Sequence, residues 1–546
     1  MYPDYGVKFM NSLLQNPDFV TLFTTEKKYV FTASEKMQCE DAVIELQQGE
    51  YGLKIKVTAD NAPLEYIRLR WNRKFPAGAR FLGDAWERSY GDLQWRVCDA
   101  SRLMPWYFLM NCGETTAGCG VRVRPSAMAL WSTDEAGVTL WLDVRCGSRG
   151  VILNGRTLEA AEIVSNEYSG VSAFSAAKTF CKEMCSDPLL SSTPVYGGNN
   201  WYYAYGSSSH EEIISDCRYI SSLCEGLENR PFMVIDDGWE VMYLKPNNSG
   251  PWTGGNSKYP DMKKLADEMR ECGVRPGIWY RPLWNLDPEI PSSWLMSERH
   301  HSGHNALDPS VPEVLELVKE DVRRFASWGY ELIKHDFSTW DMFGLWGKDM
   351  AYFPARRDEE GNDWNFSDRS RTSAEIVLGF YKAIREAAGD TLILGCNTIG
   401  HLGAGLMHLS RTGDDTSGKA WDRTRKMGIN TLAFRLCQHK AFFDVDADCI
   451  GATGLIDWKL NSQWAELLAK SATPLFASIK PGVLTESEKA DMKKMFAIAS
   501  LQKNTAEPVD WMEKPTPAVW NLDGNIRKFD WYEEAGASPD FISVYK

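Results

Sequence analysis

The chain has 546 residues, of which 44% are hydrophobic, and its formal net charge at neutral pH is −14. This length allows a large core and about two to four domains. The negative charge argues against nucleic acid or an anionic membrane as a partner, because either would need a basic face. No run of 18 apolar residues occurs, so we expect no membrane-spanning helix.

The 13 cysteines have no regular spacing and form no Cys-x-x-Cys motif. The sequence therefore contains neither a zinc signature nor a disulfide framework, and reduced thiols fit the cytoplasm. The first residues, Met1 to Tyr5, lack the basic and apolar parts of a secretion signal. We expect a cytoplasmic protein, or a periplasmic or secreted one if a signal peptide has been removed. The sequence leaves homo-oligomerisation open.

Residues 1–190 have the alternation of antiparallel strands. Apolar side chains occupy every second position in residues 42–46, 53–57 and 138–142, and turn signals separate such runs. Helical patterns are scarce, so we predict an N-terminal antiparallel β-sandwich domain. Within it, residues 82–92 are rich in aromatic and charged side chains. We interpret this segment as a loop packed at a domain interface, with direct ligand contact as the alternative.

Residues 191–482 alternate short apolar runs with amphipathic helices, which predicts a central (β/α)8 TIM barrel. The expected strands are at 195–197, 232–235, 274–279, 332–333, 392–394, 407–409, 441–443 and 473–476. The expected helices are at 211–225, 262–272, 312–328 and 374–388, with a short one at 403–407. Residues 483–546 contain a helical pattern at 486–500 and then short aromatic segments, which predicts a small C-terminal β unit.

The segment Glu331–Phe337 contains a candidate catalytic residue, and we interpret the other strand ends relative to it. An apolar run ends there in Lys334 and Asp336, which alternation places on the same side of the strand. Charges at the end of a buried strand are costly unless they are paired, and in such barrels this end binds the ligand. Asp336 is therefore a candidate nucleophile, and a Lys–Asp ion pair at the strand end is the alternative.

Five other predicted strands also end in polar or aromatic residues. These endings are Asn199–Tyr202, Asp236–Trp239, Trp279–Arg281, Cys396–Asn397 and Arg411–Asp415. Asp236 or Asp237 standing alone would be interpreted as a helix cap. Six such endings in one barrel favour a coordinated site instead.

The residue types at these ends suit cleavage of a glycosidic bond. That reaction needs one carboxylate at the anomeric carbon and a second carboxyl group to protonate the leaving oxygen. Metal ligands do not cluster at the strand ends and no Gly-rich nucleotide loop occurs, so we expect no metal and no cofactor. One rival is a metal-dependent barrel hydrolase that uses His300, His301 and His304 with Asp336. Another is an inactive sugar-binding protein.

Several motifs together resemble the α-galactosidase clan, glycoside hydrolase families 27 and 36, and family 36 more closely. They are Ile235–Trp239, Pro276–Trp279, Leu307–Ser310, Trp328–Tyr330, Ile333–Phe337 and Arg411–Thr416. The resemblance implies a retaining enzyme that cleaves terminal α-galactosyl residues from oligosaccharides or glycoconjugates by double displacement. Alternatives within the clan are α-N-acetylgalactosaminides or β-L-arabinopyranosides as substrates, and galactosyl transfer.

The resemblance also implies roles for single residues. Asp336 would be the nucleophile and Asp415 the acid/base, with Asp414 as its competitor. A less solvated setting should raise the pKa of Asp415. The residues expected to bind the substrate are Asp236, Asp237, Lys334, Arg411, Trp201, Trp239, Trp279, Cys396, Asn397 and Asp414. The ending Gly395–Thr398 lacks the Gly-rich run of many members, which leaves galactose, a 2-acetamido sugar and a pentose open.

Overall fold

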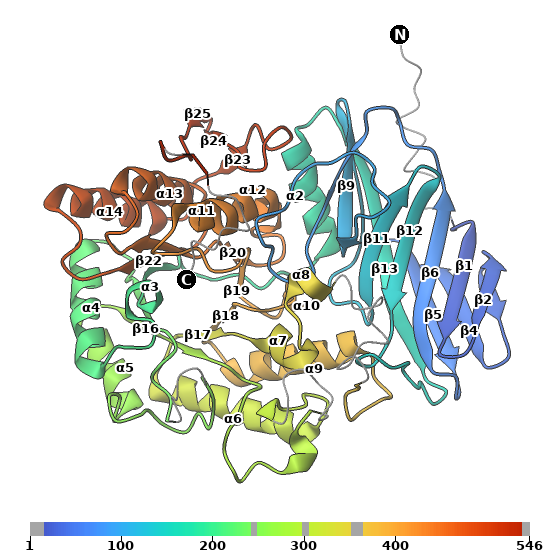
Figure 1. Ribbon diagram of the computed structural model, residues 1–546, viewed down its shortest axis with the longest axis horizontal. Coiled ribbons are helices and arrows are strands. Elements are labelled where there is room, and N and C mark those ends of the chain that lie inside the picture. The colour runs from blue at the N-terminus through green and yellow to red at the C-terminus, as the bar shows by residue number, and fades with distance from the viewer. Residues whose placement is uncertain (1–15, 242–247, 297–304, 351–363, 535, 538–546) are drawn as a thin grey trace.

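The computed structural model describes residues 16–241, 248–296, 305–350, 364–534 and 536–537. Figure 1 shows an antiparallel β-sandwich beside a curled parallel sheet that has helices around it. The sandwich comes from the N-terminal part of the chain, and a small antiparallel sheet follows near the C-terminus.

The N-terminal part consists of two antiparallel sheets, as predicted. Over the described residues, the first sheet has the order β2 (Lys28–Thr32), β1 (Phe19–Thr24), β6 (Leu64–Asn72), β12 (Gly137–Asp143), β11 (Met128–Asp134) and β8 (Met104–Pro105). The second has the order β3 (Lys36–Gln38), β4 (Ala42–Gln48), β5 (Leu53–Ala59), β13 (Thr157–Ser169), β10 (Thr115–Val121), β9 (Tyr107–Cys112) and β7 (Arg80–Gly83). In β4 and β5 the apolar positions that alternate in the sequence are the buried ones.

A helix that the sequence analysis did not predict, α2 (Ala173–Met184), follows the sandwich. It begins at Ser172, whose side chain accepts a hydrogen bond from the Ser175 amide. Its Phe180 packs against Gly118 of β10, where a side chain on residue 118 would collide with the Phe180 ring. The helix therefore covers the sheet through a close approach that a glycine permits.

The second part is a parallel sheet. Its described strands have the order β20 (Asp444–Asp446), β19 (Leu409–Arg411), β18 (Leu392–Gly395), β17 (Leu332–His335), β16 (Arg275–Tyr280), β15 (Phe232–Ile235), β14 (Tyr196–Asn199), β22 (Leu475–Ile479) and β21 (Cys449–Ala452). Every residue of β15 and β18 is buried, which explains their continuous apolar character. Every residue of β17 is buried as well, although this strand ends in Lys334 and His335. The two edge strands, β20 and β21, are consecutive in the chain.

Helices and helical turns connect these strands. Those described are α3 (Trp201–Ala204), α4 (His210–Leu223), α5 (Met262–Glu271), η1 (Ser292–Trp294), α6 (Pro312–Trp328), α7 (Ser338–Phe343), α8 (Gly347–Met350), α9 (Ser373–Ala388), α10 (Gly400–Gly403), α11 (Trp421–Arg423), η4 (Thr424–Asn430), α12 (Thr431–Arg435), η5 (Leu436–Gln438) and α13 (Trp458–Lys470). Local signals set their ends, as in α6, which begins with Pro312 and ends at Gly329 with φ of 96°. None of the helices in the described ranges combines the length and apolarity needed to cross a membrane.

The predicted seventh strand at 441–443 is wrong. Phe442 and Phe443 are buried, but they lie in the turn after η5, and the strand follows as β20 and then β21. Apolar content marked the wrong segment because the strand itself carries buried acids, Asp444 and Asp446. The sixth strand begins two residues later than the start of the predicted segment at 407–409.

The C-terminal part contains α14 (Glu486–Ala499), close to its predicted bounds, and a three-stranded antiparallel sheet. The strands of this sheet are β23 (Ala506–Pro508), β24 (Val519–Leu522) and β25 (Asn525–Lys528). Trp520 and Trp531 are buried, and the Trp531 carbonyl accepts a hydrogen bond from the Trp421 indole at 2.8 Å. The unit is therefore packed against the helices that follow β19.

A buried charge pair joins the sandwich to the parallel sheet and its helices. Asp84 follows β7, and its Oδ1 lies 3.0 Å from Nε of Arg435 on α12, while both side chains are 3% exposed. The Gln438 amide also donates a hydrogen bond to Asp84 at 2.8 Å. Nearby, the Trp106 ring stacks on His401 with 5.0 Å between ring centroids. The two parts thus share one buried polar and aromatic interface.

We expect Asp84→Ala to lower the free energy of unfolding by about 3–5 kcal/mol, because it leaves the buried Arg435 guanidinium without its carboxylate. Urea denaturation checks this value. Glu40→Ala serves as the control, since it removes an ion pair with Lys27 on the exposed surface of the sandwich and should leave the midpoint unchanged. Equal urea midpoints for the two variants would show that the buried pair does not stabilise the fold more than the exposed pair does.

Candidate active site

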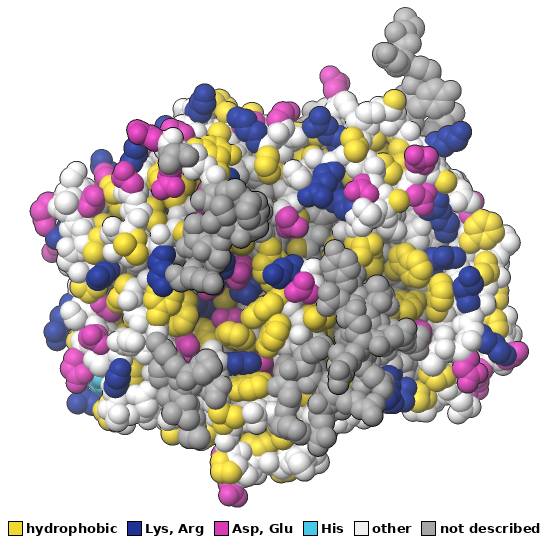
Figure 2. Space-filling model, in the orientation of Figure 1, with side chains coloured by type: hydrophobic (Ala, Val, Ile, Leu, Met, Phe, Trp, Pro, Cys, Tyr) yellow, Lys and Arg dark blue, Asp and Glu magenta, His cyan; other side chains and the backbone are white. Residues whose placement is uncertain are grey.

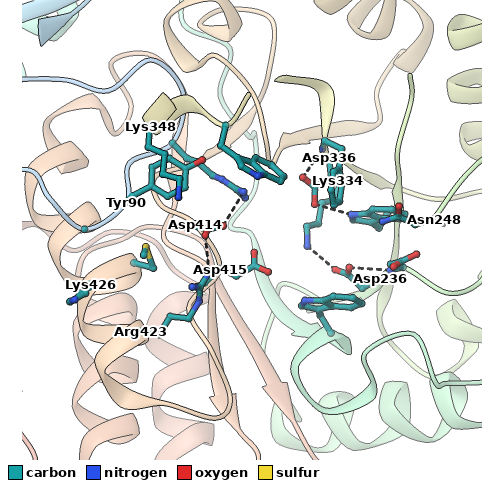
Figure 3. Close-up of a pocket in the computed structure, with 18 of the residues that line it drawn as sticks. Tyr90, Asp236, Asn248, Lys334, Asp336, Lys348, Asp414, Asp415, Arg423 and Lys426 are labelled. Carbon is teal, nitrogen blue, oxygen red and sulfur yellow. Dashed lines mark hydrogen bonds and ion pairs between the residues drawn. The ribbon is translucent and has the colours of Figure 1, made fainter. Parts of the chain in front are cut away.

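A cavity of about 660 Å³ lies at the carboxyl ends of the parallel strands. In the space-filling view the middle of this face is hollowed, and acidic, basic and hydrophobic side chains surround the hollow (Figure 2). Residues of the sandwich segment 88–92 line one side of the cavity (Figure 3). The rest is lined by residues at or after the carboxyl ends of β14, β15, β16, β17 and β19. The cavity therefore depends on both parts of the chain.

Asp336 follows β17 and lies in the lining of this cavity. Its Oδ2 accepts a hydrogen bond from the Trp279 indole at 3.2 Å, and its Oδ1 accepts one from the Phe337 amide at 2.7 Å. Phe337 has φ of 61°, a left-handed conformation that is uncommon for a residue with a side chain and recurs at functional sites. The sharp turn and the two donors hold the Asp336 carboxylate in one orientation.

Lys334 forms an ion pair with Asp236, which follows β15, and not with Asp336. Its Nζ lies 2.7 Å from Asp236 Oδ2, and Asn199 donates a second hydrogen bond to the same oxygen at 2.7 Å. Burial lowers the pKa of Lys334, but the Asp236 carboxylate outweighs this effect and raises the pKa well above its usual value. The alternative of a Lys334–Asp336 pair at the strand end is thus not what the structure shows.

Asp237 lies beside a second carboxyl group, that of Glu240. Glu240 is fully buried, and its Oε2 accepts a hydrogen bond from the Gly238 amide at 3.1 Å. Burial raises the pKa of Asp237 to about 9, and the nearby Glu240 carboxyl group adds to the increase. In the open cavity Asp237 therefore keeps its proton near pH 7 and is able to donate a hydrogen bond.

Asp415 follows β19, and its side chain is 39% exposed. Arg411 donates a hydrogen bond to its Oδ1 at 3.3 Å. Burial would raise the pKa of Asp415, but Arg411, Arg88 and Lys334 outweigh this effect and hold it at about 2. The expected increase in this pKa is therefore not found in the open cavity, because the surrounding cations stabilise the carboxylate.

Two arginines hold the neighbouring Asp414. Arg88 lies 2.9 Å from its Oδ1 and Arg423 lies 2.7 Å from its Oδ2, so both carboxylate oxygens are occupied. Arg423 also donates a hydrogen bond to the Asp415 backbone carbonyl at 2.7 Å. This arrangement distinguishes the two adjacent acids, because Asp414 fixes the loop while Asp415 faces the cavity (Figure 3).

The segment at 82–92 packs against the loop after β19, as the interface interpretation predicts, and four of its residues also line the cavity. Direct contact with a ligand stays a prediction. The Ser89 amide donates to the Thr412 carbonyl at 2.9 Å, and the Asp414 amide donates to the Ser89 carbonyl at 3.1 Å. These bonds form a short parallel bridge at the end of β19. The sandwich segment therefore fixes the loop that carries Asp415.

Most of the predicted site residues meet at the cavity. Those that line it are Trp201, Asp236, Asp237, Trp279, Lys334, Asp336, Asp414 and Asp415. The other four, Trp239, Cys396, Asn397 and Arg411, lie behind the lining and are buried.

Hydrogen bonds hold each of these four residues in place, and those of Trp239 and Arg411 reach the lining residues Trp279 and Asp415. The Trp239 indole donates a hydrogen bond to the Trp279 carbonyl at 2.8 Å. The Asn397 amide donates to the buried Glu87, and Arg411 donates to Cys396 Sγ at 3.3 Å. All four were predicted to contact the substrate from their position at strand ends. This position does not distinguish a side chain that lines the cavity from one packed behind it.

No protein-family model matches the sequence. An α-galactosidase from Thermus thermophilus, solved with p-nitrophenyl α-D-galactopyranoside, superposes with a TM-score of 0.58 and 16% identity over 93% of this chain and 98% of that one. A variant of a family 36 α-galactosidase from Geobacillus stearothermophilus, solved with 1-deoxygalactonojirimycin, superposes with a TM-score of 0.53 and 15% identity over 93% of this chain and 78% of that one. The α-galactosidase from Lactobacillus brevis superposes with a TM-score of 0.54 and 14% identity over 92% of this chain and 68% of that one. This chain has the fold of family 36 α-galactosidases.

Several residues that line the cavity were not predicted from the sequence. They include Arg88 and Tyr90 of the sandwich, and Trp346 and Lys348 at α8. The density of charged and aromatic residues at 82–92 was a signal for the first two, but nothing in the chain shows which strand end the segment meets.

Two buried acids were also missed. Arg411 lies 2.8 Å from Asp448 and 3.9 Å from Asp446. Acids at every second position from 444 to 448 were an available sign that one side of this strand is polar. Their role in this fold is to hold Arg411, which in turn contacts Asp415.

Within the described ranges, no three His, Cys, Asp or Glu side chains are grouped as a metal site would require. The histidines of the rival metal-dependent reading, His300, His301 and His304, lie outside the described residues.

The pKa of Asp237 predicts how stability depends on pH. The folded state, with a pKa of about 9, keeps a proton that the unfolded chain loses at much lower pH. The free energy of unfolding should therefore fall as pH rises through this window, by up to about 1.4 kcal/mol per pH unit from this group. Asp237→Asn should flatten this fall between about pH 5 and about pH 8.

Urea denaturation across this pH range measures the difference between the wild type and Asp237→Asn. Substitution of the exposed Asp60 by Asn provides a control that removes a carboxylate from the surface. If wild type, Asp237→Asn and Asp60→Asn lose stability in parallel as pH rises, Asp237 does not hold a proton in the folded protein.

Proposed function

We propose that this protein is a retaining glycoside hydrolase that removes terminal α-galactosyl groups from oligosaccharides or glycoconjugates. One observation carries the proposal: Asp336 and Asp415 follow two strands of one parallel sheet and line the same cavity, in different electrostatic settings. A pair of carboxyl groups is the usual machinery for cleaving a glycosidic bond. Structures with the same fold were solved with p-nitrophenyl α-D-galactopyranoside, stachyose and raffinose, which supports a galactoside substrate.

We also propose that the parallel sheet closes as the predicted (β/α)8 barrel within residues 191–482, between domains at 1–190 and 483–546. In support, β20 pairs with β19, β21 pairs with β22, and two residues separate β20 from β21. The two short strands would then be halves of one seventh strand. Closure would place Asp336 and Asp415 on opposite sides of one opening, as a double displacement requires.

In the first step, Asp336 attacks the anomeric carbon while the bond from that carbon to the aglycone oxygen breaks. A β-linked galactosyl ester forms on Asp336, and Asp415 gives a proton to the departing oxygen. Asp415 has to gain this proton when the substrate binds. A bound sugar would cover the exposed part of the Asp415 side chain, and burial raises the pKa of a carboxyl group.

In the second step, a water molecule takes the place of the aglycone. Asp415, now ionised, accepts a proton from this water as the water oxygen attacks the anomeric carbon. The ester bond to Asp336 breaks and α-galactose leaves with its original configuration. The cations around Asp415 favour the ionised form that this step needs.

The sugar itself would be bound by the polar groups around Asp336. Asp236, held by Lys334, can accept hydrogen bonds from hydroxyl groups, and the neutral Asp237 can donate one. The Trp279 and Trp201 side chains contribute apolar surface for a ring. Assays with nitrophenyl α-galactoside, α-N-acetylgalactosaminide and β-L-arabinopyranoside compare the three sugars directly, and we expect the α-galactoside to be cleaved fastest.

We expect Asp336→Ala to abolish turnover, because it removes the carboxylate that forms the ester. Asp415→Ala should retain part of its activity on nitrophenyl α-galactoside, since nitrophenol needs little protonation. Added azide should restore its rate and yield α-galactosyl azide, because azide displaces Asp336 from the β-linked intermediate. Rate measurements and NMR of the products check both expectations.

Asp414→Ala is the matched control for the azide experiment, because it removes the adjacent carboxylate. Azide rescue of Asp414→Ala but not of Asp415→Ala would transfer the acid/base role to Asp414. A β-sugar as the first product from an α-galactoside would show inversion and overturn the double displacement.

A further inference from the structure

We propose that the part of the cavity beyond the sugar site binds an aglycone that carries an anionic group, a carboxylate or a phosphate, through Lys348 and Lys426. This inference rests on the proposed function, since it assigns the aglycone of the same substrate. Figure 3 shows Asp236, Lys334 and Asp336 on one side of the cavity and Tyr90, Lys348, Arg423 and Lys426 on the other.

The aglycone side is basic in a protein that is acidic as a whole. Among the residues that the structure describes, four cations line it, Arg88, Lys348, Arg423 and Lys426, although the chain has a net charge of −14. Within the described part of the chain, the carboxylates on this side are those of Asp92, Asp414 and Asp415. Four positive charges thus face three negative ones, and the excess grows when Asp415 takes up a proton.

The cations on this side differ in how they are engaged. Asp414 is shared between Arg88 and Arg423, so one carboxylate faces two guanidinium groups. Lys348 is exposed, forms no ion pair within the described part of the chain, and has its Nζ 5.8 Å from the centre of the Tyr90 ring. An exposed ammonium group at the mouth of a cavity can meet an incoming anion without first breaking another ion pair.

Lys426 lies on η4 and lines the same side of the cavity as Lys348 (Figure 3). Its stem packs against Gly91, which has φ of 77°. A side chain at residue 91 would collide with the Lys426 Cβ. Glycine at this position therefore lets the lysine lie against the sandwich segment. Long lysine stems pack in this way while the charged head stays in contact with solvent.

Aromatic rings accompany these cations. The Arg88 guanidinium carbon lies 5.2 Å from the centre of the Trp346 ring and 5.9 Å from that of Tyr90. Tyr90 and Trp346 offer flat faces for the ring of an aglycone, and the lysines offer charge for a substituent on that ring. The combination favours an aglycone with a ring and an acidic group over a neutral sugar.

Calorimetry on Asp336→Ala, which cannot turn substrate over, tests the proposal. The ligands are 4-carboxyphenyl and 4-phosphonooxyphenyl α-galactoside, with 4-carbamoylphenyl α-galactoside as the neutral ligand of matched size. At low salt we expect at least one anionic ligand to bind about 3- to 10-fold more tightly than the neutral one. The anion with the larger preference is the one that this side of the cavity favours, and added salt should reduce the preference.

Lys348→Gln or Lys426→Gln in the same background should reduce the preference to about 2-fold or less. Lys28→Gln, on β2 of the sandwich, is the matched control and should leave it unchanged. Equal dissociation constants for the anionic and neutral ligands would overturn the proposal, and so would a preference that survives both lysine substitutions. If Asp336→Ala does not fold, the ratio of kcat/KM for the two ligands in wild type and Lys348→Gln gives the same comparison.

Hydrolysis of the neutral aryl galactoside by the wild type separates this inference from the proposed function. Hydrolysis with no preference for the anion would overturn the aglycone site alone. An anion preference that depends on Lys348 without any hydrolysis would overturn the hydrolase and support the site.

Discussion

The candidate site depends on one contact, the Asp414 carboxylate held between Arg88 of the sandwich and Arg423 after β19. The parallel bridge between Ser89 and Gly413 reinforces it with backbone hydrogen bonds. Together they fix the loop on which Asp415 lies and bring a guanidinium group close to its carboxylate. The sandwich is therefore part of the chemical environment of the cavity, and the buried pair of Asp84 and Arg435 holds it there.

The cavity drives two of its carboxyl groups to opposite protonation states. Burial and the neighbouring Glu240 raise the pKa of Asp237 to about 9, whereas cations hold that of Asp415 at about 2. Such separation of acids by their surroundings is how one site holds both a proton donor and an anion near neutral pH. Lys334 and Arg411 contribute to the low pKa of Asp415, because each remains charged inside the protein through its own acidic partners.

The sequence was sufficient to predict the elements and chemistry that local pattern controls. The strand at 232–235, the helix at 312–328 and the gathering of Asp236, Lys334 and Asp336 follow from apolar runs, caps and strand ends. The seventh strand was misplaced because it carries buried acids, of which Asp446 faces Arg411 of the neighbouring strand. Arg88 was missed for a related reason, since its partner is more than 300 positions away in the chain.

The central claim, that Asp336 is the nucleophile of a galactoside-cleaving site, is tested most directly by trapping the ester. A 5-fluoro-α-galactosyl fluoride forms the ester and slows its hydrolysis, and mass spectrometry of tryptic peptides locates the label. We predict a fluorogalactosyl group on the peptide His335–Lys348, with fragmentation that places it on Asp336 and not on Asp341. A label on another residue, or continued hydrolysis of α-galactosides with no label on the protein, would contradict the account.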